Sequence, residues 1–390
     1  MKKRALVIGA GIAGPVLGVG LARAGFEARV VEAYSERELA GAGTWLTVAV
    51  NGLAALRTFG LHQRVIDVGF PARDIELANG RGRTLGVAPL GGVLPDGTAT
   101  QNVRRADLHR VLLEGARREG VSFTFGERLA QAEPRRDRRV LARFESGREL
   151  EADVLIGADG VHSRVRTIID ASAPEPREVG MGNVGGFAPR SESLGLAPGI
   201  YRMIFGDRAF FGYVVHPSGE VWWFANPPTP VPEGAGRAWL AELFEHDEGP
   251  AAQLVRATPG RLVFSRQYEL PRVPRWTRDA MVIVGDAAHA ASPTSGQGAS
   301  LAIEDAVALS RCLRDLPVAE ALHSFELQRR ARAERVVAEA ARASTHKLPG
   351  PFGRFLRDRM LPIVLSVATR ANRDWLFTYE IPWDQPVTTH

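Results

Sequence analysis

Cysteine and lysine are scarce in this chain of 390 residues. Cys312 is the only cysteine, which excludes an intramolecular disulfide and a metal centre held by several thiolates. Only three of the 49 basic residues are lysines, so arginine carries most of the net charge of +5. The arginines are spread along the chain rather than clustered, and this spread gives no indication of a surface for nucleic acid.

Long apolar runs are also missing. No run reaches the roughly 18 to 20 residues that a membrane span requires. The N-terminus passes from Met1-Lys2-Lys3-Arg4 directly into an apolar strand, so we expect no signal peptide and a cytoplasmic location. A chain of this length with 45% hydrophobic residues can build the cores of two or more domains.

A glycine-rich turn follows the first expected strand, residues 4–9. Gly9, Gly11 and Gly14 form a GxGxxG pattern that opens a helix, and the next strand ends in Glu32. This order places a helix N-terminus where it can face a pyrophosphate, and an acid where it can accept hydrogen bonds from ribose hydroxyls. The sequence therefore predicts a dinucleotide site, and the acid argues against a ligand with a 2′-phosphate.

A second stretch in which a strand leads through a glycine turn into a helix lies near residue 286. A buried strand, residues 281–284, ends in Gly285-Asp286, and a helix begins at about Ala299. Ligands of parallel α/β sheets sit at the carboxyl ends of the strands. Asp286 could accept a hydrogen bond from a ribityl or sugar hydroxyl, and the amides of Gly298 and Ala299 could face an anionic oxygen or an electron-rich ring.

Two further features fit the same edge. A strand ending at Ala158-Asp159-Gly160 would bring a carboxylate beside the glycine turn. Arg105 stands at the start of an amphipathic helix that we expect over residues 102–120, where it could reach a phosphate or a flavin edge. An arginine on a solvated helix face is the common alternative.

Residues 174–274 change character, because prolines and aromatics become more frequent and β-type runs replace the α/β alternation. Strands are expected over 201–205, 210–216, 221–225 and 262–270, in a mostly antiparallel sheet of which one face covers a cavity. Aromatics such as Trp222, Trp223 and Phe224 are more often core residues than ligand contacts, although some should line a pocket.

Taken together, three motifs resemble the signatures of the class A flavin monooxygenases, the p-hydroxybenzoate hydroxylase fold group. They are the GxGxxG turn with Glu32, the run from Ala158 to Arg166, and Val284-Gly285-Asp286-Ala287-Ala288-His289. Their order and spacing are similar to those of the single-component aromatic and polyketide hydroxylases and of the tetracycline-degrading monooxygenases. Asp374-Trp375-Leu376-Phe377 also resembles the end of that group.

The resemblance implies an α/β fold in which a Rossmann-like FAD-binding domain carries an inserted, mostly antiparallel β domain for the substrate. The FAD-binding domain would be discontinuous, with residues 1–72, 100–173 and 274–346. The substrate domain would take 73–99 and 174–273, and a C-terminal helix and tail would take 347–390.

The resemblance also implies which residues bind FAD. Asp159-Gly160 would serve both FAD and the nicotinamide donor, and Ser300 stands where many relatives have asparagine. The expected cofactor-binding residues are Gly9, Gly11, Ile12, Ala13, Gly14, Glu32, Ala33, Arg105, Asp159, Asp286, Gly298, Ala299 and Ser300. No metal site is expected.

The activity implied is that of a monooxygenase. NADH or NADPH, bound transiently, would reduce FAD, and O₂ would form a C4a-hydroperoxide whose distal oxygen passes to a mid-sized aromatic or polycyclic molecule, most simply as a hydroxylation. His289 and His216 are candidates for an acid or base, and a structural role is favoured for His289. No catalytic side chain is assigned.

Three other functions share part of this pattern. A reductase or dehydrogenase of the same fold group would bind FAD without transferring oxygen. A flavin halogenase would need a Trp-x-Trp-x-Ile-Pro motif, of which Val221-Trp222-Trp223-Phe224 is only a partial echo. A flavin-binding protein without turnover, acting through a partner, is the third.

Overall fold

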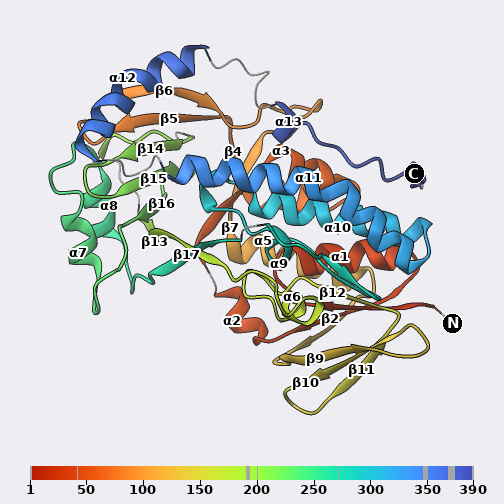
Figure 1. Cartoon of the computed structure of the whole chain (residues 1–390). Coiled ribbons are helices and arrows are strands. Elements are labelled where there is room, and N and C mark those ends of the chain that lie inside the picture. Colours follow the sequence, from red (N-terminus) through yellow and green to blue (C-terminus); the bar gives the residue numbers. More distant parts are fainter. Residues whose placement is uncertain are drawn as a thin grey trace.

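The structure is a computed structural model that describes residues 2–41, 43–189, 194–199, 201–270, 272–345, 350–367 and 374–388. Its strands form a six-stranded sheet, a seven-stranded sheet and two three-stranded sheets, and long helices cross the first of these (Figure 1). The mixed α/β class with a parallel sheet, antiparallel sheets and C-terminal helices is as predicted.

The six-stranded sheet is parallel apart from one edge strand, and its order is β18-β19-β12-β1-β2-β8. Its central strands β19, β12 and β1 are short, mainly apolar runs that are almost wholly buried, as expected for a parallel sheet covered on both faces. The strands are β1 (Arg4–Ile8), β2 (Glu27–Glu32), β8 (Ser122–Phe125), β12 (Val154–Gly157), β18 (Thr277–Arg278) and β19 (Met281–Ile283).

Two helices, α1 (Ala13–Arg23) and α10 (Gly298–Asp315), pack closely on one another beside this sheet. A Cβ added at Gly20 would lie 2.3 Å from Ser310 Oγ, so only glycine permits this approach. A third helix, α3 (Val50–Arg57), packs on α10 in the same way, with Gly52 against Ser300. Helix α10 is therefore held by α3 near its N-terminus and by α1 in its C-terminal half.

The seven-stranded sheet has the order β17-β13-β16-β15-β14-β5-β6 and includes strands from two distant parts of the sequence. One face packs on α7 (Arg237–Glu242) and α8 (Ala251–Ala257). The strands are β5 (Asp74–Asn79), β6 (Thr84–Pro89), β13 (Arg177–Ala188), β14 (Tyr201–Phe205), β15 (Phe210–Val215), β16 (Val221–Asn226) and β17 (Ser265–Glu269). The expected excursion of residues 73–99 to a second sheet is confirmed by β5 and β6; the domain boundaries themselves remain a prediction.

A three-stranded sheet has the order β3-β7-β4, and its strands belong to segments of the chain that connect the two large sheets. The strands are β3 (Trp45–Val48), β4 (Gly69–Ala72) and β7 (Thr100–Arg104). The expected helix over 102–120 is wrong at its start. Residues 102–104 belong to β7, and α5 spans Arg105–Arg118. Pairing of β7 with strands on both sides outweighs the helical pattern of its sequence.

Smaller elements complete the chain up to α10. A second three-stranded sheet, β11-β10-β9, projects from the body at the lower edge of Figure 1. The remaining elements are α2 (Glu36–Ala40), α4 (His62–Ile66), β9 (Leu129–Pro134), β10 (Val140–Phe144), β11 (Glu149–Ala152), α6 (Arg164–Ile169), α9 (Asp286–His289) and a 3₁₀ turn (Pro293–Ser295).

The C-terminal part wraps back over both large sheets. Helix α11 (Val318–Thr345) lies along α10, α12 (Pro351–Val367) lies on β6, and α13 (Asp374–Phe377) follows (Figure 1). Asn79 Nδ2 donates to Asp358 Oδ2 at 2.7 Å and ties α12 to the sheet. Residues 347–349, 368–373 and 389–390 of the expected C-terminal region fall outside the described ranges. Among the helices described, none is long and apolar enough to cross a membrane.

Candidate active site

The sequence motifs meet at one edge of the six-stranded sheet. Strands β19, β12, β1 and β2 are direct neighbours and run parallel, so their carboxyl ends share an edge. Gly285-Asp286 follows β19, Ala158-Asp159 follows β12, and Gly9 follows β1; Glu32 ends β2, with Ala33 directly after it. Four segments from three distant parts of the sequence therefore lie side by side.

Each of the three glycines of the turn occupies its position for a different structural reason. Gly9 has φ of 104°, and a Cβ there would lie 2.3 Å from the Ala158 carbonyl oxygen. A Cβ at Gly14 would lie 2.0 Å from the Gly9 carbonyl oxygen, so Gly14 lets α1 approach the strand. A Cβ at Gly11 would meet no atom within 4 Å. The protein itself does not require glycine at this position, which leaves the backbone open to a ligand.

Glu32 is fixed at the end of β2. It is buried, and its two carboxylate oxygens accept hydrogen bonds from the amides of Ala10 (2.7 Å) and Tyr34 (3.0 Å). The carboxylate thus holds the glycine turn at the carboxyl end of β2. A carboxylate has about four acceptor positions, so these two bonds leave room for ligand hydroxyls.

His109 is a site residue that the sequence did not reveal. Its buried ring lies at 2.8 Å from the carbonyl oxygen of Ala10, between Gly9 and Gly11. Burial lowers the pKa of His109, the positive charge of Arg105 also lowers it, and the hydrogen bond to Ala10 offsets only part of this. A neutral imidazole then donates to the turn. The available signal was its spacing of four residues from Arg105, on the same face of α5.

Asp159 binds protein groups rather than pointing freely to the edge. Its carboxylate accepts from Ser163 Oγ at 2.5 Å and from the amides of Arg164 and Val165, at the start of α6. Arg166, buried on the same helix, donates to the Ala287 carbonyl oxygen at 3.1 Å. The segment after β12 is thereby fixed to the segment after β19. We assign Asp159 a role in shaping the turn.

Asp286, Gly298 and Arg105 lie together. The Asp286 side chain is exposed, although the residues that follow it are buried, and a Cβ at Gly298 would lie 3.9 Å from its Oδ1. The charges of Arg105 and His289 both act on this carboxylate. Arg105 itself is half-buried, and its amide donates to the Thr44 carbonyl oxygen at 2.9 Å. An acidic side chain beside the start of α10 is thus under the influence of a basic side chain from a distant part of the sequence.

Ser300 is placed differently from its neighbours Gly298 and Ala299. Its side chain is fully buried, and its hydroxyl accepts from the amide of Ala49 at 3.1 Å, at the start of α3. The hydroxyl therefore joins two helices, and only the backbone of residue 300 could face a cofactor. Gly298 and Ala299 are half-buried.

Both helix N-termini at this edge are electrostatically suited to an anion. Neither α1, which begins after Ile12 at Ala13, nor α10 has a side-chain cap or an acid in its first turn. The unpaired amides and the positive end of the helix dipole thus remain available. These features fit the two parts of FAD that carry partial or full negative charge, the pyrophosphate and the flavin pyrimidine.

A buried ionic cluster supports the edge from behind. Asp305 on α10 accepts from His289 Nε2 at 2.5 Å, from the Gly285 amide at 2.9 Å and from Arg329 Nε at 2.8 Å. Burial would raise the pKa of Asp305, but the charges of His289 and Arg329 hold it well below its usual range. His289 is thus a structural residue in this position, the reading that the sequence favoured.

The same cluster reaches the C-terminal tail. Glu304 accepts from Arg332 through both oxygens at 2.8 Å and from Asn51 Nδ2 at 2.7 Å. Arg332 also donates to the carbonyl oxygens of Trp375 and Leu376. The tail motif is therefore connected to α10 through Arg332 of α11. The N-terminus of α10 forms part of the site.

Asn102 on β7 is a second residue that the sequence did not reveal. Its side chain is fully buried, yet neither its amide nitrogen nor its oxygen has a partner among the described residues. Asn102 pairs with Thr47 on β3, and a Cβ at Gly296 would lie 3.3 Å from Thr47 Oγ1. Buried polar groups are rarely left unpaired, so this amide points to a bound partner.

An aromatic face adjoins the edge through β3. Trp45 on β3 packs against Tyr201, Trp222 and Phe224 with ring centroids 5.8 to 6.3 Å apart. Trp222 is buried on this face and Phe224 half-buried, whereas Trp223 lies in the core on the opposite face. His216 stacks on Trp222 at the margin of the face, with Nδ1 2.8 Å from Ser218 Oγ.

Comparison with known proteins agrees with this geometry. A family model described as "FAD binding domain" matches residues 2–340. The chain is 30% identical over 386 residues to an aurachin C monooxygenase/isomerase of Stigmatella aurantiaca, covering 96% of this chain and 98% of that protein. It is also 30% identical over 351 residues to a FAD-dependent urate hydroxylase of Klebsiella pneumoniae, covering 86% and 88%.

A solved structure extends the agreement to three dimensions. Klebsiella pneumoniae HpxO, complexed with FAD and uric acid, superposes with a TM-score of 0.84 at 26% identity and covers 96% of this chain and 95% of its own. The protein is an oxidoreductase that uses FAD as its cofactor. The chain therefore belongs to the FAD binding domain family and, within it, to the class A flavin monooxygenases.

Proposed function

We propose that this enzyme takes electrons from NADH or NADPH and inserts one atom of O₂ into a mid-sized aromatic or polycyclic molecule, as a hydroxylation. The observation that carries the proposal is the position of the aromatic face, which adjoins the edge where the cofactor motifs meet. The link between them is β3, whose Thr44 flank contacts Arg105 and whose Trp45 packs on the aromatic face.

Different residues at the edge would bind different parts of the cofactor. Gly9, Gly11, Ile12, Ala13 and Gly14 would receive the pyrophosphate at the start of α1, and Glu32 with Ala33 the ribose of the adenosine half. Asp286 would accept from a ribityl hydroxyl, and the amides of Gly298, Ala299 and Ser300 would face the flavin ring. Arg105 would add positive charge beside the flavin. Bound FAD supplies the redox and oxygen chemistry.

The protein's own contribution is to position the substrate and to exclude water. Trp45, Tyr201 and Phe224 present apolar rings, which suit a planar substrate. Arg104 stacks over Phe187 with its guanidinium carbon 4.1 Å from the ring centroid, and it pairs with Glu220. This cationic margin would orient a polar group of the substrate, while the aromatic rings keep water from the reacting carbon.

The experiment is a product analysis under labelled oxygen. Purified enzyme is incubated with NADH or NADPH, O₂ carrying a heavy oxygen isotope, and a panel of phenols and polycyclic phenols. The proposal predicts a product that is heavier by one labelled oxygen atom and absent without the nicotinamide donor. A product that carries the label only when the water is labelled would contradict it. Donor oxidation that yields a reduced product would assign the enzyme as a reductase of the same fold group, and a dehydrogenated product formed without consumption of the donor would assign it as a dehydrogenase.

A further inference from the structure

Helix α12 lies at the outer margin of the molecule and exposes large apolar side chains along one side (Figure 1). Phe355, Leu356, Met360 and Ile363 are 46 to 60% exposed. On a helix with 3.6 residues per turn these four positions fall within an arc of about 140°, so they form one continuous stripe. We call these four residues the outer stripe. Single exposed apolar residues are ordinary, whereas a contiguous set of them indicates an interaction surface.

The opposite side of α12 already packs on the seven-stranded sheet. A Cβ added at Gly86 of β6 would lie 2.6 Å from the Leu365 side chain, so the two elements are in close contact. Asn79 of β5 donates to Asp358 on the same side of the helix. These contacts attach α12 to the sheet without using the outer stripe, which is therefore available to a partner.

The charge on the exposed side of α12 is positive. The helix has three arginines and a single acid, Asp358, which is bound to the sheet and paired with Arg357 at 2.8 Å. Arg359 is exposed within the arc of the outer stripe, and its guanidinium carbon lies 5.3 Å from the ring centroid of Phe355. It has no ion pair among the residues that the structure describes. The complementary partner therefore combines an apolar surface with negative charge.

The size of the outer stripe distinguishes a lipid surface from a second protein. The 17 residues of α12 extend over about 25 Å, and a helix is about 10 Å wide, so the stripe offers about 250 Å². Each partner in a stable protein pair contributes about 800 Å². A lipid surface has no such minimum, because an interfacial helix inserts its apolar side chains singly while its arginines stay among the headgroups.

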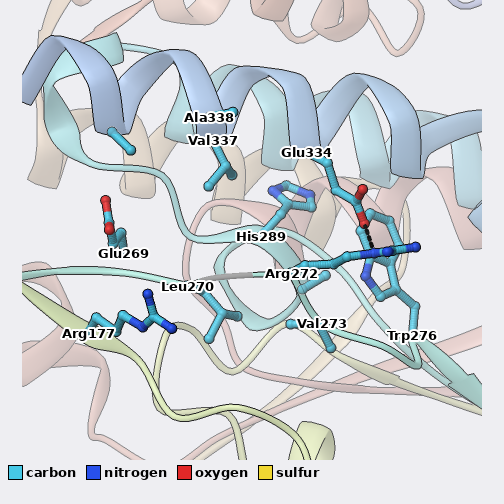
Figure 2. Close-up of a pocket in the computed structure, with 12 residues that line it drawn as sticks. Arg177, Glu269, Leu270, Arg272, Val273, Trp276, His289, Glu334, Val337 and Ala338 are labelled. Carbon is cyan, nitrogen blue, oxygen red and sulfur yellow. Dashed lines mark ion pairs between the residues drawn. The ribbon is translucent and has the colours of Figure 1, made fainter.

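A second apolar surface is recessed and does not suit a membrane. Helix α11 and the segment after β17 line a hollow of about 290 Å³, with Leu270, Val273 and Val337 on its wall (Figure 2). Arg272 and Glu334 form an ion pair at 3.4 Å on the same lining. A lipid surface is flat on this scale and would have to enter the recess past charged groups. The outer stripe, in contrast, stands on the outside of a helix.

We propose that the outer stripe attaches the enzyme to the surface of a membrane that contains anionic lipids. Its four apolar side chains enter the boundary between headgroups and acyl chains, and Arg359 pairs with a lipid phosphate. The attachment is peripheral. Among the helices described, none is long and apolar enough to cross the bilayer.

The attachment brings the membrane to the margin of the aromatic face. Asn79, which contacts α12, shares one side of β5 with Ile75, a residue packed on the aromatic face. The guanidinium carbon of Arg357 lies 4.5 Å from the ring centroid of Phe205, which shares its side of β14 with Tyr201. A lipid-soluble substrate would thus reach the site from the bilayer. This consequence rests on the proposed function, whereas the attachment itself does not.

Flotation with vesicles tests the attachment. The FAD-loaded enzyme, without NADH or NADPH, is mixed with vesicles of phosphatidylcholine alone or of equal parts phosphatidylcholine and phosphatidylglycerol. The enzyme should float with the anionic vesicles, with a partition coefficient roughly tenfold higher than for the neutral ones. Added salt should lower this coefficient, because it screens the charges. No turnover is needed, so failure of the proposed monooxygenase activity would leave this outcome unchanged.

Variants locate the contact. Met360→Ser combined with Ile363→Ser should lower the partition coefficient for anionic vesicles by about tenfold. Val263→Ser combined with Leu327→Ser removes two exposed apolar side chains outside α12 and should float as the wild type does. Arg359→Gln should weaken binding to anionic vesicles by about fivefold and leave binding to neutral vesicles unchanged. The flavin absorption retained by each variant shows that it is folded.

A dye placed on the outer stripe gives a second readout. The only natural cysteine, Cys312, is buried, so Met360→Cys provides a single accessible thiol for a polarity-sensitive dye. Its emission should shift to shorter wavelength when anionic vesicles are added. The same dye on Leu327→Cys, at an exposed position of α11, should show no shift.

Four results would overturn the proposal. Equal flotation of the wild type and of the variant with Met360→Ser and Ile363→Ser would place the attachment elsewhere. Equal partition into neutral and anionic vesicles would exclude recognition of anionic lipid. A monomeric enzyme that floats with neither kind of vesicle would show that the outer stripe binds no membrane. A dimer in light scattering that does not float, and that the same double substitution dissociates, would assign the stripe to a second copy of the chain.

Discussion

His289 Nε2 lies 2.5 Å from Asp305 Oδ2, and both side chains are buried. This contact joins α9, which follows the cofactor turn, to the middle of α10, whose first residues form another part of the same edge. Asp305 also pairs with Arg329 on α11. One carboxylate thus holds three elements, and several expected outcomes depend on it.

Replacement of Asp305 by asparagine should destabilise the protein strongly. Arg329 would lose one of its two carboxylate partners in a site without solvent, and breaking a buried ion pair costs about 3 to 5 kcal/mol. Urea unfolding of the FAD-free protein measures this loss. Asp107→Asn, which removes the exposed partner of Arg110, is the control and should cost less than about 1 kcal/mol. Equal losses in the two variants would contradict the cluster's role.

The stabilisation by His289 should depend on pH. Its pKa is raised in the folded protein, so the pair with Asp305 is fully formed below the unfolded pKa of about 6.5 and weakens as pH rises through the folded pKa. The free energy of unfolding lost in His289→Gln should therefore be largest near pH 6 and should shrink in alkaline solution. Urea titrations of both proteins across this range provide the measurement, and a difference that grows with pH would show that the sign is wrong.

Gly11 and Gly14 should respond oppositely to alanine. Gly11→Ala places its methyl group in open space, so the FAD-free protein should unfold at the same urea concentration or slightly higher. Its affinity for FAD should fall at least tenfold, since the methyl group would occupy the path of the pyrophosphate. Gly14→Ala would collide with the Gly9 carbonyl and should destabilise the fold itself. Unchanged FAD affinity in Gly11→Ala would contradict the placement of the cofactor.

Asp286→Ala tests the other half of the cofactor. A hydrogen bond to a charged group contributes about 1.5 to 3 kcal/mol, so the dissociation constant for FAD should rise roughly 10- to 150-fold. Flavin fluorescence during dilution of the loaded protein measures it. Glu133→Ala, on the outer sheet at β9, should leave the constant unchanged. A similar change in both variants would mean that the effect is not local.

Arg332 should control the order of the C-terminal tail. Arg332→Met removes the hydrogen bonds to the carbonyls of Trp375 and Leu376 and leaves Glu304 with fewer partners. Hydrogen exchange at residues 375–379 should then accelerate at least tenfold. Arg335→Gln, which removes a cation–π contact with Trp375 and an exposed ion pair with Glu339, should have a smaller effect. If the tail exchanges as slowly in Arg332→Met as in the wild type, other contacts hold it.

The sequence predicted those features that depend on local order. Gly9, Gly14 and Glu32 stand at spacings that only one strand–turn–helix arrangement explains, and the parallel sheet then brings Asp159 and Asp286 to the same edge. The aromatic runs around Trp222 likewise predicted a β sheet. Successive residues of a strand point to opposite faces of such a sheet.

Features that depend on packing between distant elements could not be predicted from the local order of residues. Strand β13 was not expected because it contains four glycines; the structure explains two of them, since a Cβ at Gly185 or Gly186 would lie 2.7 Å from a side chain of Thr44 or Thr258. The side chain of Ser300 turns to α3, and Asn102 lies in the middle of a strand rather than at the start of a helix. His109, Arg329 and Arg332 become meaningful only once α5, α10 and α11 are placed.

The most direct test of the central claim uses one cuvette. The visible spectrum of the purified protein is recorded, and NADH or NADPH is then added in air with and without a candidate phenol or polyketide. We expect flavin absorption bands and consumption of one nicotinamide donor, accelerated by a compound that fits the aromatic face. A colourless protein that cannot be reconstituted with FAD would contradict the cofactor site. Flavin bands without oxidation of either donor would contradict the proposed monooxygenase activity.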